Sequence, residues 1–353
     1  MPDTVGRRNN PAPSQHAIEA LHLATAYQAS RALQVAIRLG LVDLIAGEPQ
    51  SAQELAPQTE THAASLRRLL RTLAAYGVFL EQSDGRFALG PLGSVLRTGT
   101  PGSVRDLALM WGDDDYWVTW AELERCVRTG RTASEHLFGA KDAFQRYAAD
   151  PRFAPIFNAG MTASSATTAA AVLANYDFST VKSVTDVGGG QGHLIAAILK
   201  ANSALRGTLL DLPSVIEKAP HLLAQAGVID RCEVLGGDMF AKVNEGSDLY
   251  ILSRVIDSFD DDRAVSVLIN CRRAMGKTAR LLLIEPVLPD KIEAPAPLDL
   301  QANMLMDLNM LVRTGGCERT QSEYRTFLAA ADLQLKRIIP TEASVSLIEA
   351  EPA

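Results

Sequence analysis

The spacing of hydrophobic residues changes along the chain. Between residues 32 and 73, apolar side chains recur every three or four positions, which predicts amphipathic helices ending near Gly40 and Gly77. Two short β segments then flank Ser83-Asp84-Gly85, a glycine-bearing turn that predicts a hairpin. Helices followed by a hairpin predict a mainly α, winged-helix-like domain over residues 16–100.

Beyond residue 178, short apolar runs alternate with helical stretches. Apolar runs of this kind suit strands that are buried on both faces of a parallel sheet. The alternation predicts an α/β, doubly wound (Rossmann-like) domain over residues 179–353. The expected strands are Val181–Val187, Arg206–Asp211, Arg231–Gly236, Ser247–Ser253 and Ala279–Glu285, with a terminal β pair near Leu335–Pro340 and Ala343–Ile348.

Two further segments complete the expected organisation. Residues 1–15 are polar and contain proline, which predicts a disordered tail. Residues 101–178 are expected to be a helical linker that contributes to a substrate pocket, because aromatic residues are concentrated there and aromatic walls are typical of small-molecule sites.

The segment Asp186-Val-Gly-Gly-Gly-Gln-Gly-His193 follows the first expected strand and opens a helix. A glycine-rich turn between a strand and a helix is typical of a cofactor site at the carboxyl end of a parallel sheet. Gly188, Gly190 and Gly192 have the spacing GxGxG, whereas the dinucleotide motif requires a glycine where this chain has His193. The spacing therefore favours S-adenosylmethionine over a nicotinamide cofactor.

Acidic residues end the first three strands of this domain. Asp186 precedes the glycine loop, Asp211 ends the second strand, and Asp238 follows the third. A carboxylate about 20 residues after a glycine turn can accept hydrogen bonds from ribose hydroxyls. Each aspartate alone is better explained as a helix cap or a turn residue. Together, at successive strand ends, they predict a nucleoside-like ligand.

Composition narrows the classes of partner. The chain has 353 residues, 47% of them hydrophobic and 21% charged, with a formal net charge of −7. An acidic balance argues against general affinity for nucleic acid or an anionic membrane. The four cysteines are widely spaced, which suggests neither a disulfide framework nor a metal site. Without an apolar signal segment or membrane span, a cytoplasmic protein is expected.

Four segments together resemble a known family, the S-adenosylmethionine-dependent small-molecule O-methyltransferases of the caffeate, hydroxyindole and polyketide type. The resemblance extends over nearly the whole chain, and the combination is more specific than the glycine loop alone. The segments are Ser183-Val-Thr-Asp-Val-Gly-Gly-Gly-Gln-Gly192, Leu209-Leu-Asp-Leu-Pro-Ser-Val-Ile216, Gly236-Gly-Asp-Met-Phe240 and Thr314-Gly-Gly-Cys-Glu-Arg-Thr-Gln-Ser-Glu-Tyr324.

The resemblance implies a set of site residues and a homodimer. The amino-terminal domain would be the dimerisation domain, closing the partner subunit's pocket. Asp211 would bind ribose, and Asp238 and Met239 would flank adenine. The full set of implied cofactor-binding residues is Asp186, Gly188, Gly190, Gly192, Asp211, Leu212, Asp238, Met239, Phe240 and Ser253.

The sequence departs from this family at the expected base. O-methylating members carry a histidine after the fourth strand, in a pattern like Val-Leu-His-Asp-Trp-Asp-Asp, whereas this chain has Val255-Ile-Asp-Ser-Phe-Asp-Asp261. Asp257 therefore stands in the position of the histidine, with Glu285 and Glu318 as the flanking acids. These three are the candidate catalytic residues. An aspartate with an ordinary pKa near 3.9 is a weaker base than histidine, although clustered carboxylates can raise that pKa.

Three interpretations of Asp257 stay open. It is the base for O-methylation, tuned by its neighbours; or the acceptor is a thioether, an amine or an acidic hydroxyl that needs no base; or methyl transfer has been lost. A structural alternative is that Asp257 caps the helix that begins near Asp260.

The candidate substrate-binding residues combine aromatic, methionine and arginine side chains. An arginine fork would suit a substrate carboxylate, whereas an apolar lining would suit a flat aromatic or polyketide substrate. The candidates are Trp111, Tyr116, Phe157, Met161, Arg254, Met306, Met310 and Arg313. A DNA-binding role for the winged-helix-like domain, through Arg67, Arg68 and Arg71, is the less favoured alternative because of the acidic net charge.

Overall fold

The computed structural model describes residues 14–140 and 142–353, so most of the expected disordered tail lies outside the described residues. The chain divides into two compact units, Met1–Gly112 and Asp113–Ala353. The division falls inside residues 101–178, which the sequence predicts to be a linker. None of the helices in the described ranges is both long and apolar enough to cross a membrane.

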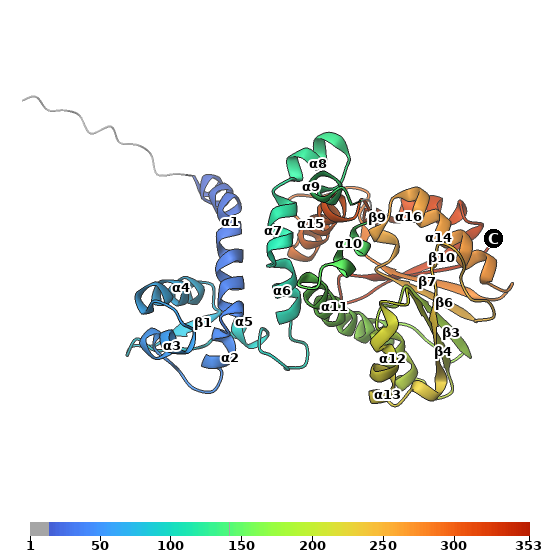
Figure 1. Cartoon of the computed structure of the whole chain (residues 1–353). Coiled ribbons are helices and arrows are strands. Elements are labelled where there is room, and N and C mark those ends of the chain that lie inside the picture. Colours follow the sequence, from blue (N-terminus) through green and yellow to red (C-terminus); the bar gives the residue numbers. More distant parts are fainter. Residues whose placement is uncertain (1–13, 141) are drawn as a thin grey trace, which may run out of the picture. The chain divides into compact units, whose positions relative to one another are not determined.

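The first unit has helices packed around a small hairpin, as predicted (Figure 1). Its core is formed by α1, α2, α4 and the hairpin, with Leu70 and Phe79 fully buried. The predicted capping box is present at α3, where Ser51 and Glu54 cap each other's backbone N–H groups. The elements are α1 (Gln15–Arg38), α2 (Leu41–Ile45), α3 (Ala52–Gln58), α4 (Ala63–Ala75), β1 (Phe79–Glu81), β2 (Phe87–Leu89), α5 (Pro91–Ser94) and α6 (Arg105–Trp111).

The arginines of α4 that suggested DNA binding are partly engaged within the unit. Arg71 Nε and Arg67 Nη2 lie 2.9 and 3.3 Å from the carboxylate of Glu81 on β1. This ion-pair pattern is that of an ordinary solvated helix face.

The second unit begins with helices and continues into a mixed sheet. The sheet has seven strands in the order β10-β11-β7-β6-β3-β4-β5, in which β3 to β7 run parallel and β11 is antiparallel to both β7 and β10. The helices before the sheet are α7 (Asp114–Trp120), α8 (Leu123–Thr129), α9 (Ala133–Phe138), α10 (Ala143–Ala149) and α11 (Phe153–Asn175). The strands are β3 (Ser183–Val187), β4 (Arg206–Asp211), β5 (Cys232–Gly236), β6 (Leu249–Ser253), β7 (Arg280–Glu285), β10 (Leu333–Pro340) and β11 (Ser346–Pro352).

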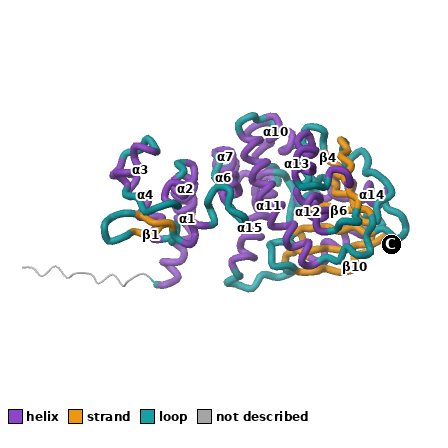
Figure 2. The backbone as a smooth tube through the Cα atoms, turned by 90° about the horizontal axis from the view of Figure 1, so that it is seen from below, coloured by secondary structure: helices purple, strands orange, loops and turns teal. Residues whose placement is uncertain are grey.

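Helices cover both faces of this sheet, as the doubly wound prediction requires (Figure 2). One hydrophobic core joins the sheet to α11, α12 and α13, and the other joins it to α14 and α16. These helices are α12 (His193–Ala201), α13 (Ala219–Gln225), α14 (Asp261–Ala274) and α16 (Gln321–Ala329), and α15 (Leu298–Arg313) lies between β7 and α16 in sequence. The central strands β6 and β7 are buried on both faces, and their sequences are therefore mainly apolar rather than alternating.

The strand predictions are confirmed for the five parallel strands to within about two residues. The terminal pair exists, but β11 covers Ser346–Pro352 rather than Ala343–Ile348. A short parallel pair, β8 (Val287–Leu288) with β9 (Arg319–Thr320), was not predicted. With only two residues in each strand, β8 and β9 leave no periodicity to detect.

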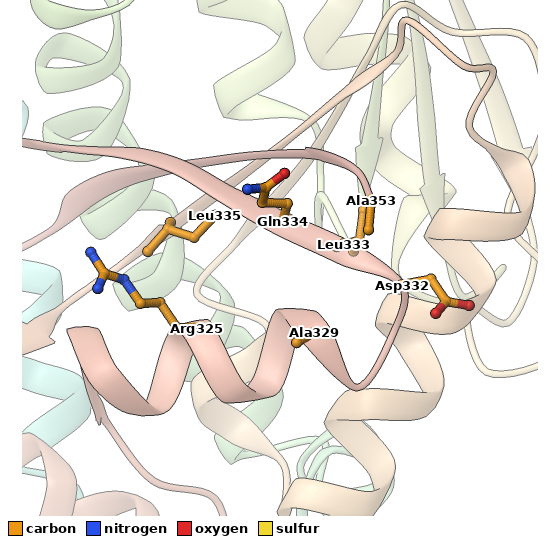
Figure 3. Close-up of a pocket in the computed structure, with 7 residues that line it drawn as sticks. All are labelled: Arg325, Ala329, Asp332, Leu333, Gln334, Leu335 and Ala353. Carbon is orange, nitrogen blue, oxygen red and sulfur yellow. The ribbon is translucent and has the colours of Figure 1, made fainter.

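A shallow pocket lies between α16 and β10, the edge strand of the sheet (Figure 3). It is lined by Arg325, Ala329, Asp332, Leu333, Gln334, Leu335 and Ala353. None of the residues predicted from the sequence to form a site lines this pocket. The candidate site lies instead at the carboxyl ends of β3 to β7.

Candidate functional site

The glycine loop is held in a conformation that favours glycine. Gly188, Gly190 and Gly192 all have positive φ angles, of 70°, 61° and 86°, which L side chains rarely adopt. Gly189 is required for a different reason, because a Cβ there would lie 2.5 Å from Cγ of Asp186. The loop thus packs directly on the Asp186 carboxyl.

Asp186 is buried beneath this loop. Neither carboxylate oxygen has a hydrogen-bond partner among the described residues. Burial, and then the charge of Asp211, raise the pKa of Asp186 to about 7. Burial and the charge of Asp211 thus both favour the neutral form of the Asp186 carboxyl beneath the loop.

Asp211 closes the loop from the neighbouring strand. Its Oδ2 accepts a hydrogen bond from the Gly190 N–H at 2.8 Å, and its Oδ1 accepts one from the Leu212 N–H at 2.7 Å. Burial raises the pKa of Asp211, against the lowering effect of these two bonds. The side chain is at the end of β4, and Leu212 is exposed beside it.

The segment after β5 lies against the glycine loop. A Cβ at Gly188 would lie 3.6 Å from Sδ of Met239. The Asn270 side chain, on α14, donates to the carbonyls of both Met239 and Phe240, at 2.9 and 2.8 Å. Asp238 is exposed, and its carboxylate accepts the Phe240 N–H at 2.9 Å.

These residues fit S-adenosylmethionine. A Cβ built at Gly190 would meet no atom within 4 Å, so the loop faces open space. The half-buried Asp211 carboxylate accepts from the Gly190 N–H of this loop, and Met239 Sδ lies near Gly188. A backbone cradle, an acceptor for ribose and an apolar side chain are the groups that a nucleoside with a charged tail requires.

Asp257 is buried in a short 3-10 helix, η3 (Ile256–Ser258), directly after β6. Both of its oxygens are engaged: Ser258 Oγ donates to Oδ1 at 3.0 Å, and Arg254 Nε lies 3.1 Å from Oδ2. The N-cap of α14 is Asp260, whose carboxylate accepts the Arg263 N–H. The structural alternative, in which Asp257 caps this helix, is therefore wrong.

Glu285 and Glu318 lie in the same cluster, as the sequence predicts. Glu285 Oε1 accepts the N–H groups of Val255 and Ile256, at 2.9 and 3.0 Å. Burial, followed by the charge of Asp257, raises the pKa of Glu285. The same causes raise the pKa of Glu318 to about 8.

Arg254 supplies the positive charge of the cluster. Besides its contact with Asp257, its Nη2 lies 3.8 Å from Glu318 Oε1. Burial would lower the pKa of the guanidinium, but Asp257, Glu318 and Glu285 raise it instead. Arg254 therefore stays charged while the two glutamates are favoured in their neutral forms.

A series of aromatic rings connects the cofactor side of the site to the helices before the sheet. Phe259 contacts Phe240 and Phe144, with ring centroids 5.1 and 6.0 Å apart. Phe144 in turn contacts Phe157, at 6.2 Å. Of these rings, Phe240 and Phe157 are candidate site residues from the sequence. Phe259 entered only as part of the segment Val255–Asp261, and Phe144 only as one of the aromatic residues concentrated in residues 101–178.

Arg313 has a different environment from Arg254. Its side chain is fully buried, with Nη2 2.8 Å from Asp115 and Nη1 donating to Thr119 Oγ1 at 2.9 Å. The guanidinium also lies 3.7 Å above the Tyr116 ring. Arg313 and Tyr116 thus pack together and join α15 to α7.

The remaining predicted substrate residues are placed as follows. Met306 and Met310 lie on α15, and Met161 lies on α11, four residues after Phe157. Met310 is buried, and its Sδ accepts a hydrogen bond from Thr314 Oγ1 at 3.8 Å. Trp111 ends α6 in the first unit and is 45% exposed.

Sequence reasoning missed the residues that hold η3 in place. A Cβ at Gly316 would lie 2.0 Å from the Asp257 carbonyl oxygen, so the loop before β9 packs directly on this turn. Arg319 donates to the carbonyls of Ile256 and Phe259. The pair Gly315-Gly316 was the only sequence signal of this close approach.

Comparisons with known proteins agree with this geometry. The model of the O-methyltransferase domain matches residues 120–334, and that of the O-methyltransferase dimerisation domain matches residues 21–99. The chain is 42% identical to the phenazine O-methyltransferase of Lysobacter antibioticus, over 94% of this chain and 95% of that one. It is 37% identical to the mitomycin biosynthesis 6-O-methyltransferase of Streptomyces lavendulae (91% and 90%).

Two other similar proteins carry further information. The phenazine-1-carboxylate N-methyltransferase of Pseudomonas aeruginosa is 30% identical, over 92% of this chain and 94% of that one. A crystal structure of an O-methyltransferase from neocarzinostatin biosynthesis, in complex with S-adenosylmethionine and 2-hydroxy-5-methyl naphthoic acid, superposes with a TM-score of 0.78 at 31% identity and covers 92% of this chain and 96% of that one.

The glycine cradle, the acidic strand ends and the two family models lead to one assignment. The first unit carries the family's dimerisation domain, which supports a homodimer, and the second carries the cofactor site. The chain belongs to the O-methyltransferase family and is an S-adenosylmethionine-dependent methyltransferase that acts on a small molecule.

Proposed function

We propose that the protein methylates a hydroxyl oxygen on a small aromatic or heteroaromatic metabolite. The observation that carries the proposal is the aromatic series from Phe240 through Phe259 and Phe144 to Phe157, which begins in the segment after β5 that lies against the glycine loop. Flat aromatic side chains suit a flat acceptor. The names of the relatives, a phenazine and a mitomycin O-methyltransferase, support the same class.

The cofactor residues are assigned by the same proposal. Gly188, Gly190 and Gly192 face the methionine part of the cofactor, Asp211 accepts from the ribose hydroxyls, and Asp238 and Met239 flank the adenine. When bound, S-adenosylmethionine supplies a methyl group on a positively charged sulfur. The protein's own contribution is to bind the acceptor in line with that methyl group and to exclude water.

The surroundings of Asp257 bear on how the acceptor hydroxyl loses its proton. The Asp257 side chain is only 2% exposed, and its two oxygens already accept from Ser258 and pair with Arg254, which leaves an acceptor hydroxyl little access to it. A general base must have a lone pair within reach of the proton that it removes. We therefore do not assign the base to Asp257, and the hydroxyl must be acidic enough to need little help.

N-methylation is the second candidate function. It is favoured by the absence of histidine from position 257 and by the similarity to an N-methyltransferase of a phenazine carboxylate. A neutral aromatic nitrogen has a free lone pair and requires no base. S-methylation of a thioether would be base-free for the same reason.

The proposal is tested by turnover with a panel of hydroxy-aromatics, aromatic amines and thioether acids, measured as formation of S-adenosylhomocysteine. We expect turnover with hydroxy-aromatics and none with thioether acids. The Asp257→Asn variant should retain most of its activity across pH 6 to 9. Turnover confined to amines or thioethers would overturn the proposal.

A further inference from the structure

Within the acid cluster, Arg254 is the member with the most accessible side chain. It is 18% exposed, compared with 2% for Asp257 and 0% for Glu318, and Glu285 is likewise fully buried. A ligand that reaches this cluster therefore meets the guanidinium before it meets a carboxylate.

The ion pairs leave part of the guanidinium fork available. Asp257 pairs with Nε and Glu318 approaches Nη2. The contacts that define these two ion pairs are made by Nε and Nη2 rather than by Nη1. Because arginine presents five N–H donors in a planar fork, a side chain held in this way still has donors for a ligand oxygen.

The backbone of Arg254 is strained. Its φ angle is +56°, in the left-handed region that residues other than glycine rarely adopt. Such conformations are energetically unfavourable and cluster at ligand-binding and catalytic sites. The backbone N–H of Arg254 is fixed by the Ile284 carbonyl at 3.1 Å, which holds the turn in place.

Arg254 also lies next to the cofactor loop. It directly follows Ser253, the last residue of β6. The next residue, Val255, packs on the glycine loop, since a Cβ at Gly188 would lie 3.0 Å from Val255 Cγ2. The backbone of Arg254 is thus one residue away from a contact with the glycine loop.

From these observations we propose that Arg254 binds the acceptor oxygen, and that the site takes a hydroxyl acidic enough to bind as its oxyanion. The proposal rests on the proposed O-methylation. It assigns to Arg254 a contact with the acceptor oxygen itself rather than with a substrate carboxylate.

The chemistry then needs no protein base. The hydroxyl proton passes to solvent as the acceptor binds, and the guanidinium donates hydrogen bonds to the resulting oxyanion. A lone pair of that oxygen forms the bond to the methyl carbon while the carbon–sulfur bond breaks. The electron pair of that bond stays on sulfur, so a positive sulfonium and a negative oxygen yield two neutral centres.

The carboxylates become positioning residues in this arrangement. Asp257 and Glu318 hold the guanidinium from two sides, and Glu285 holds the backbone N–H groups of Val255 and Ile256. Replacing Asp257 with Asn keeps a hydrogen-bonding side chain and removes a negative charge beside Arg254. This change should strengthen the attraction of the site for an oxyanion.

The direct test is the ionisation of a bound coloured phenol. 4-nitro-1-naphthol is titrated spectrophotometrically with the protein saturated with S-adenosylhomocysteine, so that no methyl transfer occurs. We expect the bound probe to ionise at a pH about one unit lower than the free probe. In Arg254→Met the shift should vanish, and in Asp257→Asn it should be equal or larger.

Arg280→Met is the matched control, because Arg280 is another partly buried arginine that pairs with a carboxylate, Glu349, at the opposite end of β7. It should leave the probe shift unchanged. If Arg254→Met does not fold, Arg254→Lys tests the same claim, since it keeps the charge and loses the fork; a smaller shift is expected.

Kinetics separate this proposal from the proposed function. With hydroxy-aromatics that the wild type methylates, Arg254→Met should lower kcat/KM at least about tenfold. An unchanged probe shift in Arg254→Met, a probe that binds only in its neutral form, or no binding at all would contradict the role of Arg254. Failure of the wild type to methylate any hydroxy-aromatic would instead contradict the proposed function.

Discussion

At the scale of single residues, the glycine loop has no space for a side chain at position 189. A Cβ at Gly189 would lie 2.5 Å from both Asp186 Cγ and Leu209 Cδ1. Since both groups are buried, Gly189→Ala should displace the loop and weaken S-adenosylmethionine binding at least about tenfold, or about 1.4 kcal/mol. Calorimetry measures the change.

The control for this prediction is Gly276→Ala. Gly276 has open space at its Cβ position and no positive φ angle. Its cofactor affinity should equal that of the wild type. If Gly189→Ala binds S-adenosylmethionine as tightly as the wild type does, the packing of Gly189 on Asp186 is not required for cofactor binding.

Glu318 makes stability depend on pH. Burial and Asp257 raise its pKa from an ordinary 4.5 to about 8. Between pH 4.5 and about 8, the Glu318 side chain keeps its proton in the folded protein but loses it in the unfolded chain. The stability that the neutral side chain allows is therefore fully present below pH 4.5 and is lost as the pH rises to about 8. Glu318→Gln removes this dependence.

We expect Glu318→Gln to gain stability relative to the wild type as the pH rises. The difference in the free energy of unfolding should be small near pH 5 and should favour the variant by about 1–3 kcal/mol at pH 9. Urea unfolding at a series of pH values measures it. If the difference in the free energy of unfolding does not change with pH, the pKa of Glu318 is not raised in the folded protein.

The sequence predicted which residues gather at this site but not how they pair. Asp257, Glu285 and Glu318 do lie together. That Arg254 would engage Asp257 could not be predicted, because it depends on the left-handed φ angle of Arg254 and on the Gly316 loop packed against the Asp257 backbone. The Arg254 turn is held by the Ile284 carbonyl, 30 residues away, and Gly316 is 59 residues from Asp257, so both depend on tertiary contacts.

At the scale of elements, the parallel strands were predictable because burial on both faces leaves long apolar runs. β11 was displaced by several residues, since the terminal pair alternates less regularly and bears a bulge between Leu335 and Arg337 of β10. The contacts of α7 with α15 could not be predicted either, because they depend on a buried ion pair between Asp115 and Arg313, 198 residues apart.

That ion pair yields a prediction about element packing. Arg313→Met removes the contacts with Asp115, Thr119 and the Tyr116 ring. Breaking a buried pair costs about 3–5 kcal/mol. Arg71→Met, which removes an exposed pair with Glu81, should cost about 0–1 kcal/mol. Thermal and urea unfolding measure the loss of stability in the two variants. Similar losses in Arg313→Met and Arg71→Met would show that α15 is held by its apolar contacts alone.

At the scale of the whole molecule, the exposed apolar residues of α1 point to the dimer. Leu21, Leu23 and Tyr27 are 62%, 81% and 57% exposed within the chain, and they lie in the segment matched by the dimerisation domain. Apolar groups left exposed in this way are typical of an interface. Leu23→Asp should therefore shift the protein from dimer to monomer in sedimentation equilibrium.

The matched control on the same helix is Gln28→Ala, which removes an exposed polar side chain. It should remain dimeric. A wild type that sediments as a monomer, or a Leu23→Asp variant that stays dimeric at low concentration, would show that α1 does not form the interface.

The most direct test of the whole account is the position of the transferred methyl group. The protein is given S-adenosylmethionine with a carbon-13 methyl label and a fused aromatic acceptor that carries one hydroxyl and one amino group. Nuclear magnetic resonance of the product separates the two outcomes. The account predicts a labelled methyl ether, formed faster as the hydroxyl is made more acidic; a labelled N-methyl group with the hydroxyl untouched would contradict it.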